Sequence, residues 1–137
     1  MCYYTTFNKK DGTYAISLDT LNGTAFIYRS HVFFRYRERI VKDDSIETQD
    51  LIKRFMVRNK DVAWVLNTES FSAAYKKYER DNVPQMAVRI AEGNGFVERL
   101  GENLYLMKTI LSDEMLSGNQ ISAFSDLENM RKSFVPR

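Results

Sequence analysis

The residues best suited to chemistry fall close together in the sequence, between positions 31 and 39. His31 is the only histidine of the chain. In a helix, with about 100° between residues, His31, Arg35 and Arg39 stack in one row, and Glu38 lies beside them. Histidine exchanges a proton near neutral pH, and the planar guanidinium of arginine engages two phosphate oxygens at once. The spacing therefore predicts a face that could handle phosphate.

Phosphodiester cleavage without a metal needs an acid or base and cations that stabilise the developing charge. In that interpretation His31 is the general acid or base, Arg35 and Arg39 bind phosphate, and Lys108 is a transition-state cation. A plainer interpretation is also open. The arginines could pair with Glu38 on a solvated helix face, and a histidine at a helix start could cap or pack.

The segment that carries this face is amphipathic. Val32, Phe33, Tyr36 and Ile40 lie opposite the polar row, and we expect Ser30 to cap the helix. Phe34 falls off the apolar side. An aromatic ring among arginines could stack on bases, or form part of a protein interface.

A second helix is expected to begin near Asp44 or Ser45. Asp44 and Glu47 have the spacing of a capping box, and Asn59 is a suitable stop. Asp43 and Asp50 complete an acidic cluster here, and carboxylates can hold Mg²⁺. Because capping and the helix dipole already explain these acids, we predict no metal site.

Strands are expected on both sides of these helices. Residues 3–28 contain Asp11-Gly12 and Asn22-Gly23, which are turn signals, and predict a meander of two or three strands. Residues 61–66 have the composition of a buried strand. Apolar residues at helical spacing predict a helix over 69–81.

A second meander is predicted from three segments separated by glycine-containing turns, at 86–91, 96–100 and 104–111. Alternation places Met86, Val88 and Ile90 on one face of it. It likewise places Leu104, Leu106, Lys108 and Ile110 on one face. Residues 112–116 and 122–134 are expected to be helical, with Ser122 or Ser125 as the cap of the latter. The chain is thus predicted to be a single α+β domain over 1–137.

Three basic residues interrupt the second meander, namely Arg89, Arg99 and Lys108, with Tyr105 nearby. They face either solvent or a cleft. If His31 packs over this sheet face, Arg89 is a further phosphate-binding candidate in a groove for RNA.

Composition limits the alternatives. Twenty basic and eighteen acidic residues give a net charge of +2, so an anion site must come from local clustering. One cysteine, Cys2, rules out an internal disulfide and, with one histidine, a conventional zinc site within one chain. We expect a cytoplasmic protein, because neither a signal peptide nor a membrane span is recognisable. No motif for a nucleotide, metal or other cofactor occurs, so none is predicted.

The order of elements resembles the small bacterial toxin ribonucleases of the BrnT and RelE-like group. In that group, an early helix with a His-x-x-x-Arg-x-x-x-Arg pattern precedes an antiparallel meander. His31, Arg35 and Arg39 match the helix pattern, and the resemblance would place Arg89, Lys108 and Thr109 at the sheet side of the site. It covers residues 30–111. The N-terminal meander, the helix at 69–81 and the near-neutral charge depart from the group.

Three functions remain open on the sequence. The first is a nucleic-acid-interacting domain that binds RNA or another phosphate-bearing ligand, and that could act as a metal-independent ribonuclease. The second is a protein-interaction module or homodimer that uses Phe34 and its neighbouring arginines. The third is a regulatory protein that binds a small anion without turnover. Binding without catalysis ranks slightly ahead, since a polar cluster alone does not imply chemistry.

Overall fold

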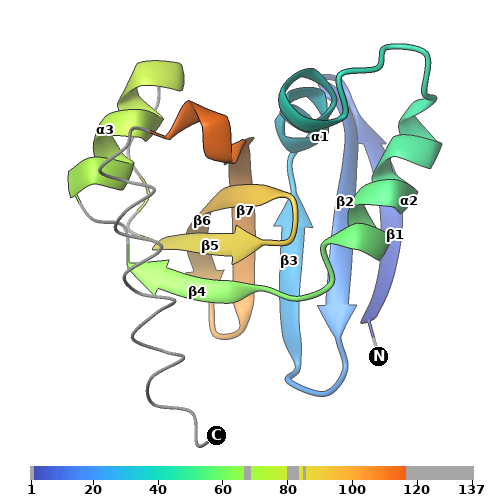
Figure 1. Ribbon diagram of the computed structural model, residues 1–137. Helices are drawn as coiled ribbons and strands as arrows, with labels where there is room; N and C mark the ends of the chain where they lie inside the picture. Colours follow the sequence, from blue (N-terminus) through green and yellow to red (C-terminus); the bar gives the residue numbers. More distant parts are fainter. Residues whose placement is uncertain (1, 67–68, 80–83, 85, 117–137) are drawn as a thin grey trace, which may run out of the picture.

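The computed structural model describes residues 2–66, 69–79, 84 and 86–116. Within this part the chain is a single α+β domain, as the sequence predicts: one seven-stranded sheet with three helices packed against it (Figure 1). The strands are β1 (Cys2–Lys9), β2 (Gly12–Asp19), β3 (Thr24–Tyr28), β4 (Ala63–Leu66), β5 (Met86–Ile90), β6 (Gly93–Gly101) and β7 (Leu104–Leu111). The helices are α1 (Ser30–Tyr36), α2 (Thr48–Arg58) and α3 (Glu69–Tyr78), with a π turn η1 (Arg37–Val41) and a 3-10 turn η2 (Asp113–Met115).

The strand order is β1-β2-β3-β7-β6-β5-β4. Both predicted meanders are present, and they meet where β3 pairs with β7. This contact is the one parallel pairing in the described sheet, with Ala25 opposite Leu104 and Tyr28 opposite Met107. Each meander is closed by short turns, which is why local turn signals predict them well.

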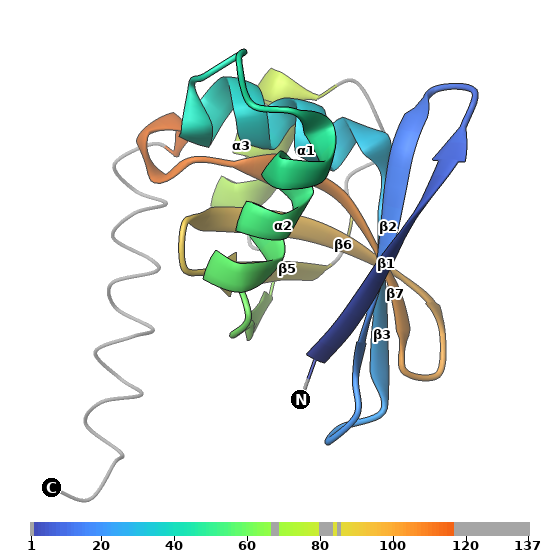
Figure 2. The ribbon, with the colours of Figure 1, turned by 90° about the vertical axis from the view of Figure 1, so that its right-hand side faces the viewer.

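Side-chain alternation divides the core into two clusters on opposite faces of the sheet. Val88, Val97 and Ile110 belong to the cluster covered by α1 and α2. Their sequence neighbours Ala87, Phe96 and Leu111 belong to the cluster covered by α3. Figure 2 shows α1 and α2 together on one side of the sheet. The helix predicted over 69–81 is confirmed as α3, which the structure describes to Tyr78.

One predicted sheet face is wrong because β7 contains a β-bulge. Phe96 is opposite Thr109 and Val97 is opposite Met107, so Lys108 is an extra residue in the pairing. The added residue reverses the alternation beyond it. Ile110 therefore packs in the same cluster as Met107, and not on a common face with Leu104 and Leu106.

Both helix starts were predicted wrongly. α1 has Arg29, not Ser30, at its N-cap, because the Ser30 hydroxyl donates to the Asp11 carbonyl oxygen at 3.1 Å. α2 begins at Thr48 instead of near Asp44. Asp43 accepts from the backbone nitrogen of Ser45 at 2.9 Å, and this local turn holds the preceding residues out of the helix. The end of α2 at Asn59 is as predicted.

Two further segments differ from expectation. The strand β4 lies at an outer edge of the sheet and is not buried; its Trp64 is 44% exposed. The turn between β5 and β6 is shorter than predicted, and β6 already begins at Gly93. Of the expected C-terminal helices, the first is reduced to the turn η2, and 122–134 lies outside the described residues.

Candidate functional site

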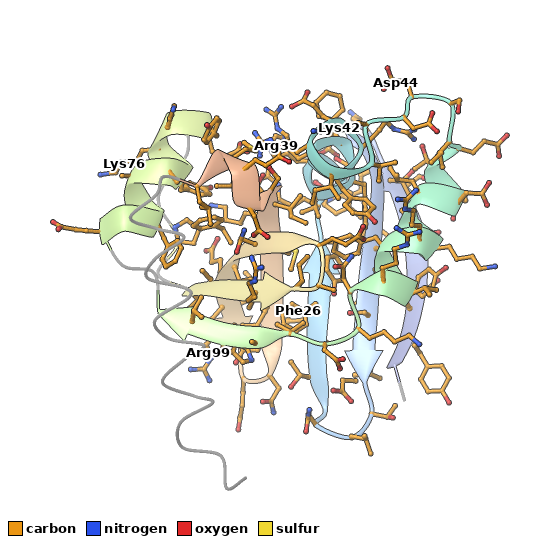
Figure 3. The ribbon with its side chains drawn as sticks, viewed as in Figure 1. Phe26, Arg39, Lys42, Asp44, Lys76 and Arg99 are labelled. Carbon is orange, nitrogen blue, oxygen red and sulfur yellow. The ribbon has the colours of Figure 1, made fainter. Side chains whose placement is uncertain are left out.

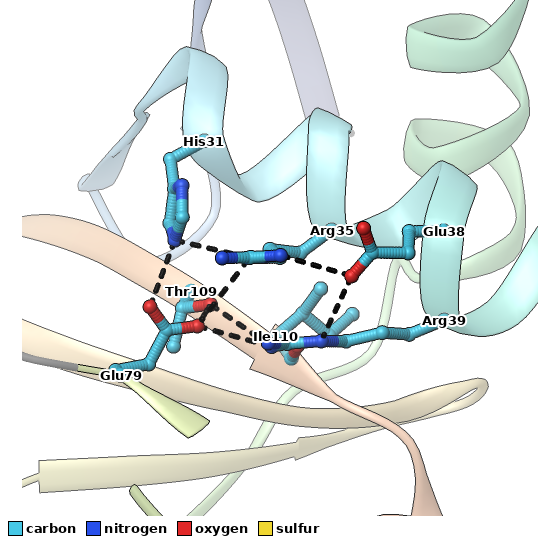
Figure 4. Close-up of polar contacts among 7 residues, drawn as sticks. All are labelled: His31, Arg35, Glu38, Arg39, Glu79, Thr109 and Ile110. Atoms are coloured by element: carbon cyan, nitrogen blue, oxygen red, sulfur yellow. Dashed lines mark hydrogen bonds and ion pairs between the residues drawn. The ribbon is translucent and has the colours of Figure 1, made fainter. Parts of the chain in front are cut away.

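The helix α1 presents the predicted polar row because its opposite side is needed for the core. Val32, Phe33 and Tyr36 are buried against α2 and the sheet. The row of His31, Arg35 and Arg39 therefore points toward the end of α3 and the end of β7 (Figure 4). Arg39 itself lies in the π turn that continues α1.

The centre of this cluster is Glu79, which the sequence analysis did not single out. Its Oε2 lies 2.9 Å from His31 Nε2. Its Oε1 accepts from Thr109 Oγ1 at 2.7 Å and from Arg39 Nη1 at 3.1 Å, and lies 3.7 Å from Arg35 Nε. Four side chains from α1, its π turn and β7 thus converge on one carboxylate that follows α3.

The Glu79 carboxylate is ionised at neutral pH although its side chain is only 9% exposed. Burial raises its pKa, but hydrogen bonds from His31 and Thr109, with the charges of His31 and Arg39, lower the pKa to about 2. Burial also lowers the pKa of Arg39, and the charge of Glu79 opposes that effect. Arginine remains protonated throughout the usual pH range, so the contact is a true ion pair.

Ionised Glu79 fixes the proton arrangement on His31. A carboxylate only accepts hydrogen bonds, so Nε2 must carry a proton and donate it to Glu79. Nε2 then cannot accept from Arg35 Nε, and their 3.4 Å separation is a contact without a hydrogen bond. Among the described residues, none has a hydrogen bond to Nδ1. Nδ1 is therefore the nitrogen left for a ligand.

Arg39 has a structural task in addition to its charge. The strand β3 pairs with β7 only as far as Met107, so β7 continues beyond its neighbour. Arg39 Nη1 donates to the Ile110 carbonyl oxygen at 2.8 Å and thereby satisfies this uncovered edge. The Arg39 side chain is 7% exposed. It is buried among protein partners and is poorly placed to bind phosphate.

Arg35 is more accessible than Arg39. Its side chain is 24% exposed, donates to Glu38 at 2.9 Å and lies over the ring of Phe34 at 5.4 Å. Phe34 is 59% exposed, consistent with its position off the apolar side of the helix. An exposed ring with a guanidinium on it offers both stacking and charge to a ligand.

His31 also lines a groove of about 470 Å³. It runs between the β1–β2 turn, α1 and the start of α2, with Phe33 and Leu51 among its apolar lining. Its polar lining consists of Asp11, Thr13, Arg29, Ser30, His31, Arg37 and Thr48. Phe34 also borders it. The groove thus combines two guanidiniums, an imidazole, hydroxyl groups and two aromatic rings.

One acid opposes these cations. Asp11 is exposed, and hydrogen bonds from Tyr14 and Ser30 together with the charge of Lys9 hold its pKa below the usual range despite some burial. Arg37 Nη1 donates to the Asp43 carbonyl oxygen at 3.1 Å, which steadies its side chain. With Arg29 and Arg37 against Asp11, the groove has a net positive charge before His31 is counted.

The structure places the other two predicted site cations elsewhere. Arg89 donates to both carboxylate oxygens of Asp113 and to Asn94. That contact lowers the pKa of Asp113. Lys108, on the bulge of β7, lies 3.7 Å from Glu98. Each cation therefore has an acidic partner of its own, apart from the cluster around Glu79.

Sequence reasoning missed three residues of this region. Glu79 lies 48 positions from His31, at the end of a helix with weak periodicity, and no local signal links the two. Arg29 and Arg37 do carry a signal: they flank Phe33 at four-residue spacing, on a second row of the same helix. The prediction rests on the His31 row alone and does not include this second row.

Further findings concern metals and membranes. Within residues 2–66, 69–79, 84 and 86–116, no three side chains of His, Cys, Asp or Glu are grouped so that they could hold a metal ion. No helix in that part of the chain is long and apolar enough to span a membrane. Comparison with protein-family models, curated proteins and solved structures finds no match to this chain. The likeness to toxin ribonucleases therefore stays a prediction.

Proposed function

We propose that this protein binds a single-stranded RNA through its phosphates, in the groove beside α1. The observation that carries the proposal is the lining of that groove, where Arg29 and Arg37 accompany His31 and the exposed ring of Phe34. Guanidiniums bind phosphate oxygens and aromatic rings stack on unpaired bases. This corresponds to the nucleic-acid or anion binding expected from the sequence, with the phosphate contacts moved from Arg39 to the groove arginines.

The balance of charge supports the groove over the Glu79 cluster as the phosphate site. In the cluster, Arg35 and Arg39 face the carboxylates of Glu38 and Glu79, so their charge is compensated. A phosphate there would displace ion pairs that are already made. Among the described residues that line the groove, Asp11 is the one acid.

The test is the affinity of the full chain for a short fluorescent single-stranded RNA, measured by anisotropy at fixed salt. Arg37→Ala should weaken binding about tenfold, which corresponds to roughly 1.4 kcal/mol, and reduce the salt dependence. Arg99→Ala is the matched control, because it removes the same charge from β6, at a residue that does not line the groove and that Figure 3 shows well away from Arg39. Equal losses in the two variants would mean diffuse attraction and would refute a specific groove.

RNA cleavage is a second candidate, and the His31–Glu79 contact favours it. A histidine whose one nitrogen is fixed by a carboxylate can present its other nitrogen as a base. Here that nitrogen is Nδ1, on a residue that also lines the groove. Purified protein and His31→Ala should be incubated with RNA in EDTA. Cleavage by the wild type alone supports catalysis, while intact RNA in both reactions leaves binding as the function.

A further inference from the structure

The strand β1 is an outer strand of unusual length for an unprotected edge. It has eight residues, whereas the opposite outer strand β4 has four. From Tyr3 to Lys9 every residue is exposed except Thr6, which is half-buried. Figure 2 looks onto this edge of the sheet, with β1 in front. A row of backbone donors and acceptors is therefore presented to solvent.

The usual devices that block edge pairing are missing from β1. The strand contains no proline, its pairing with β2 is continuous from Cys2 to Lys9, and its one charged residue is Lys9 at the end. Tyr, Thr and Phe, which favour strands, fill its centre. Natural proteins protect long edges by bulges, prolines or central charges, unless the edge has a partner.

The register with β2 defines which side chains of β1 share a face. Tyr3 is opposite Leu18 and Phe7 is opposite Tyr14, so Tyr3, Thr5 and Phe7 lie on one face. The other face carries Thr6, whose hydroxyl approaches Gln49 of α2. Tyr3 and Phe7 are both exposed, at 57% and 41%. They stand on either side of Thr5 at equal spacing.

We propose that β1 pairs antiparallel with β1 of a second copy of this chain, with Thr5 on the two-fold axis. Facing residues in a sheet must point to the same side. The two-fold axis must therefore pass through a residue position and not between two residues. With Thr5 opposite Thr5 of the second copy, Tyr3 lies opposite Phe7 on both sides of the axis. The sheets of the two copies become one.

Self-complementarity is what selects a second copy as the partner. One two-fold axis pairs the two exposed aromatic residues of this face, Tyr3 and Phe7, with each other. Cross-strand aromatic and threonine pairs are stabilising. The antiparallel arrangement also keeps the two Lys9–Lys10 ends at opposite ends of the joined strands, so like charges stay apart. The pairing uses none of the residues that line the RNA groove.

Light scattering coupled to gel filtration tests the assembly. The full chain should have twice its own mass of 16.1 kDa. Phe7→Lys should shift it to the mass of one chain, because a charge replaces half of each aromatic pair. The double variant Tyr3→Glu/Phe7→Lys should restore the dimer, because opposite charges then face each other across the axis. Circular dichroism checks that each variant is folded.

Cysteine crosslinking tests the register. In a Cys2→Ser background, Thr5→Cys places two thiols on the axis, where facing Cα atoms are about 4.5–5.5 Å apart, within disulfide range. Lys9→Cys is the control, because its symmetry mate would lie roughly 27 Å away along the strands. Thr5→Cys alone should crosslink under mild oxidation. Any of three results would overturn the proposal. These are a single species of one-chain mass at all concentrations, a dimer that persists in Phe7→Lys, and equal crosslinking at both positions.

Discussion

Glu79 Oε2 and His31 Nε2 lie 2.9 Å apart and join the end of α3 to the start of α1. These helices cover different faces of the sheet. The contact therefore ties the two faces together at the point where β7 extends beyond β3. It is also the contact that sets which nitrogen of His31 is left for a ligand.

Acid should lower the free energy of unfolding, because it protonates Glu79. The pKa of this carboxyl is lowered from 4.5 to about 2 in the folded protein. The contribution of ionised Glu79 to stability is complete above pH 4.5. It is lost as pH falls toward 2, because the carboxyl is protonated more easily in the unfolded chain. The loss should be at most about 3 kcal/mol. Urea unfolding of the wild type and Glu79→Gln should show stabilities that converge over this range, and a constant difference would contradict the assignment.

Arg39→Met should destabilise the fold strongly. It leaves Glu79 with a buried, less compensated charge and the Ile110 carbonyl oxygen without its donor. Breaking a buried ion pair costs about 3–5 kcal/mol. Arg58→Met is the matched control, because Arg58 is 53% exposed and 3.5 Å from Glu92, and an exposed pair contributes less than about 1 kcal/mol. Chemical denaturation compares the two; similar losses would argue against a structural role for Arg39.

Thr109→Val should lower stability without loss of volume. The threonine is 1% exposed, and its hydroxyl donates to Glu79 Oε1 at 2.7 Å. Loss of a buried donor to a charged acceptor costs roughly 1.5–3 kcal/mol. The pKa of Glu79 should also rise, because one cause of its lowering is gone. A carboxyl titration followed by carbon NMR checks this, and an unchanged midpoint would show that the hydroxyl is unimportant.

Phe34→Ala should weaken RNA binding with little effect on stability. The ring is largely exposed and borders the groove, and stacking on a base is worth about 1–3 kcal/mol. Val57→Ala, a truncation of an exposed side chain on α2, is the control. Anisotropy should detect a lower affinity for Phe34→Ala alone. If both variants bind RNA as the wild type does, Phe34 has no part in recognition.

Local signals account for the parts of the fold that the sequence predicts. Asp11-Gly12 and Asn22-Gly23 mark real turns, and α1 follows from its apolar spacing. The errors arise where distant contacts decide. Ser30 leaves the cap position because Asp11 takes its hydroxyl, and one added residue at Lys108 reverses the face of Ile110.

The residues of the candidate site fall into the same two groups, those placed by local signals and those placed by distant contacts. His31, Arg35 and Arg39 are brought together because one helix carries them all. Glu79 is brought to them only by the packing of α3 on the far face of the sheet, which no spacing in the sequence encodes. Likewise, the partners of Arg89 and Lys108 depend on how β6, β7 and η2 meet.

The parallel pairing of β3 with β7 also has a consequence for folding. It joins strands about eighty residues apart in sequence, and such distant contacts are slow to form. On the ribosome, the first meander must wait until the second has been synthesised before the sheet can close. Until then the apolar sides of β3 and α1 lack their principal partner, so the nascent chain should depend on chaperones late in its synthesis.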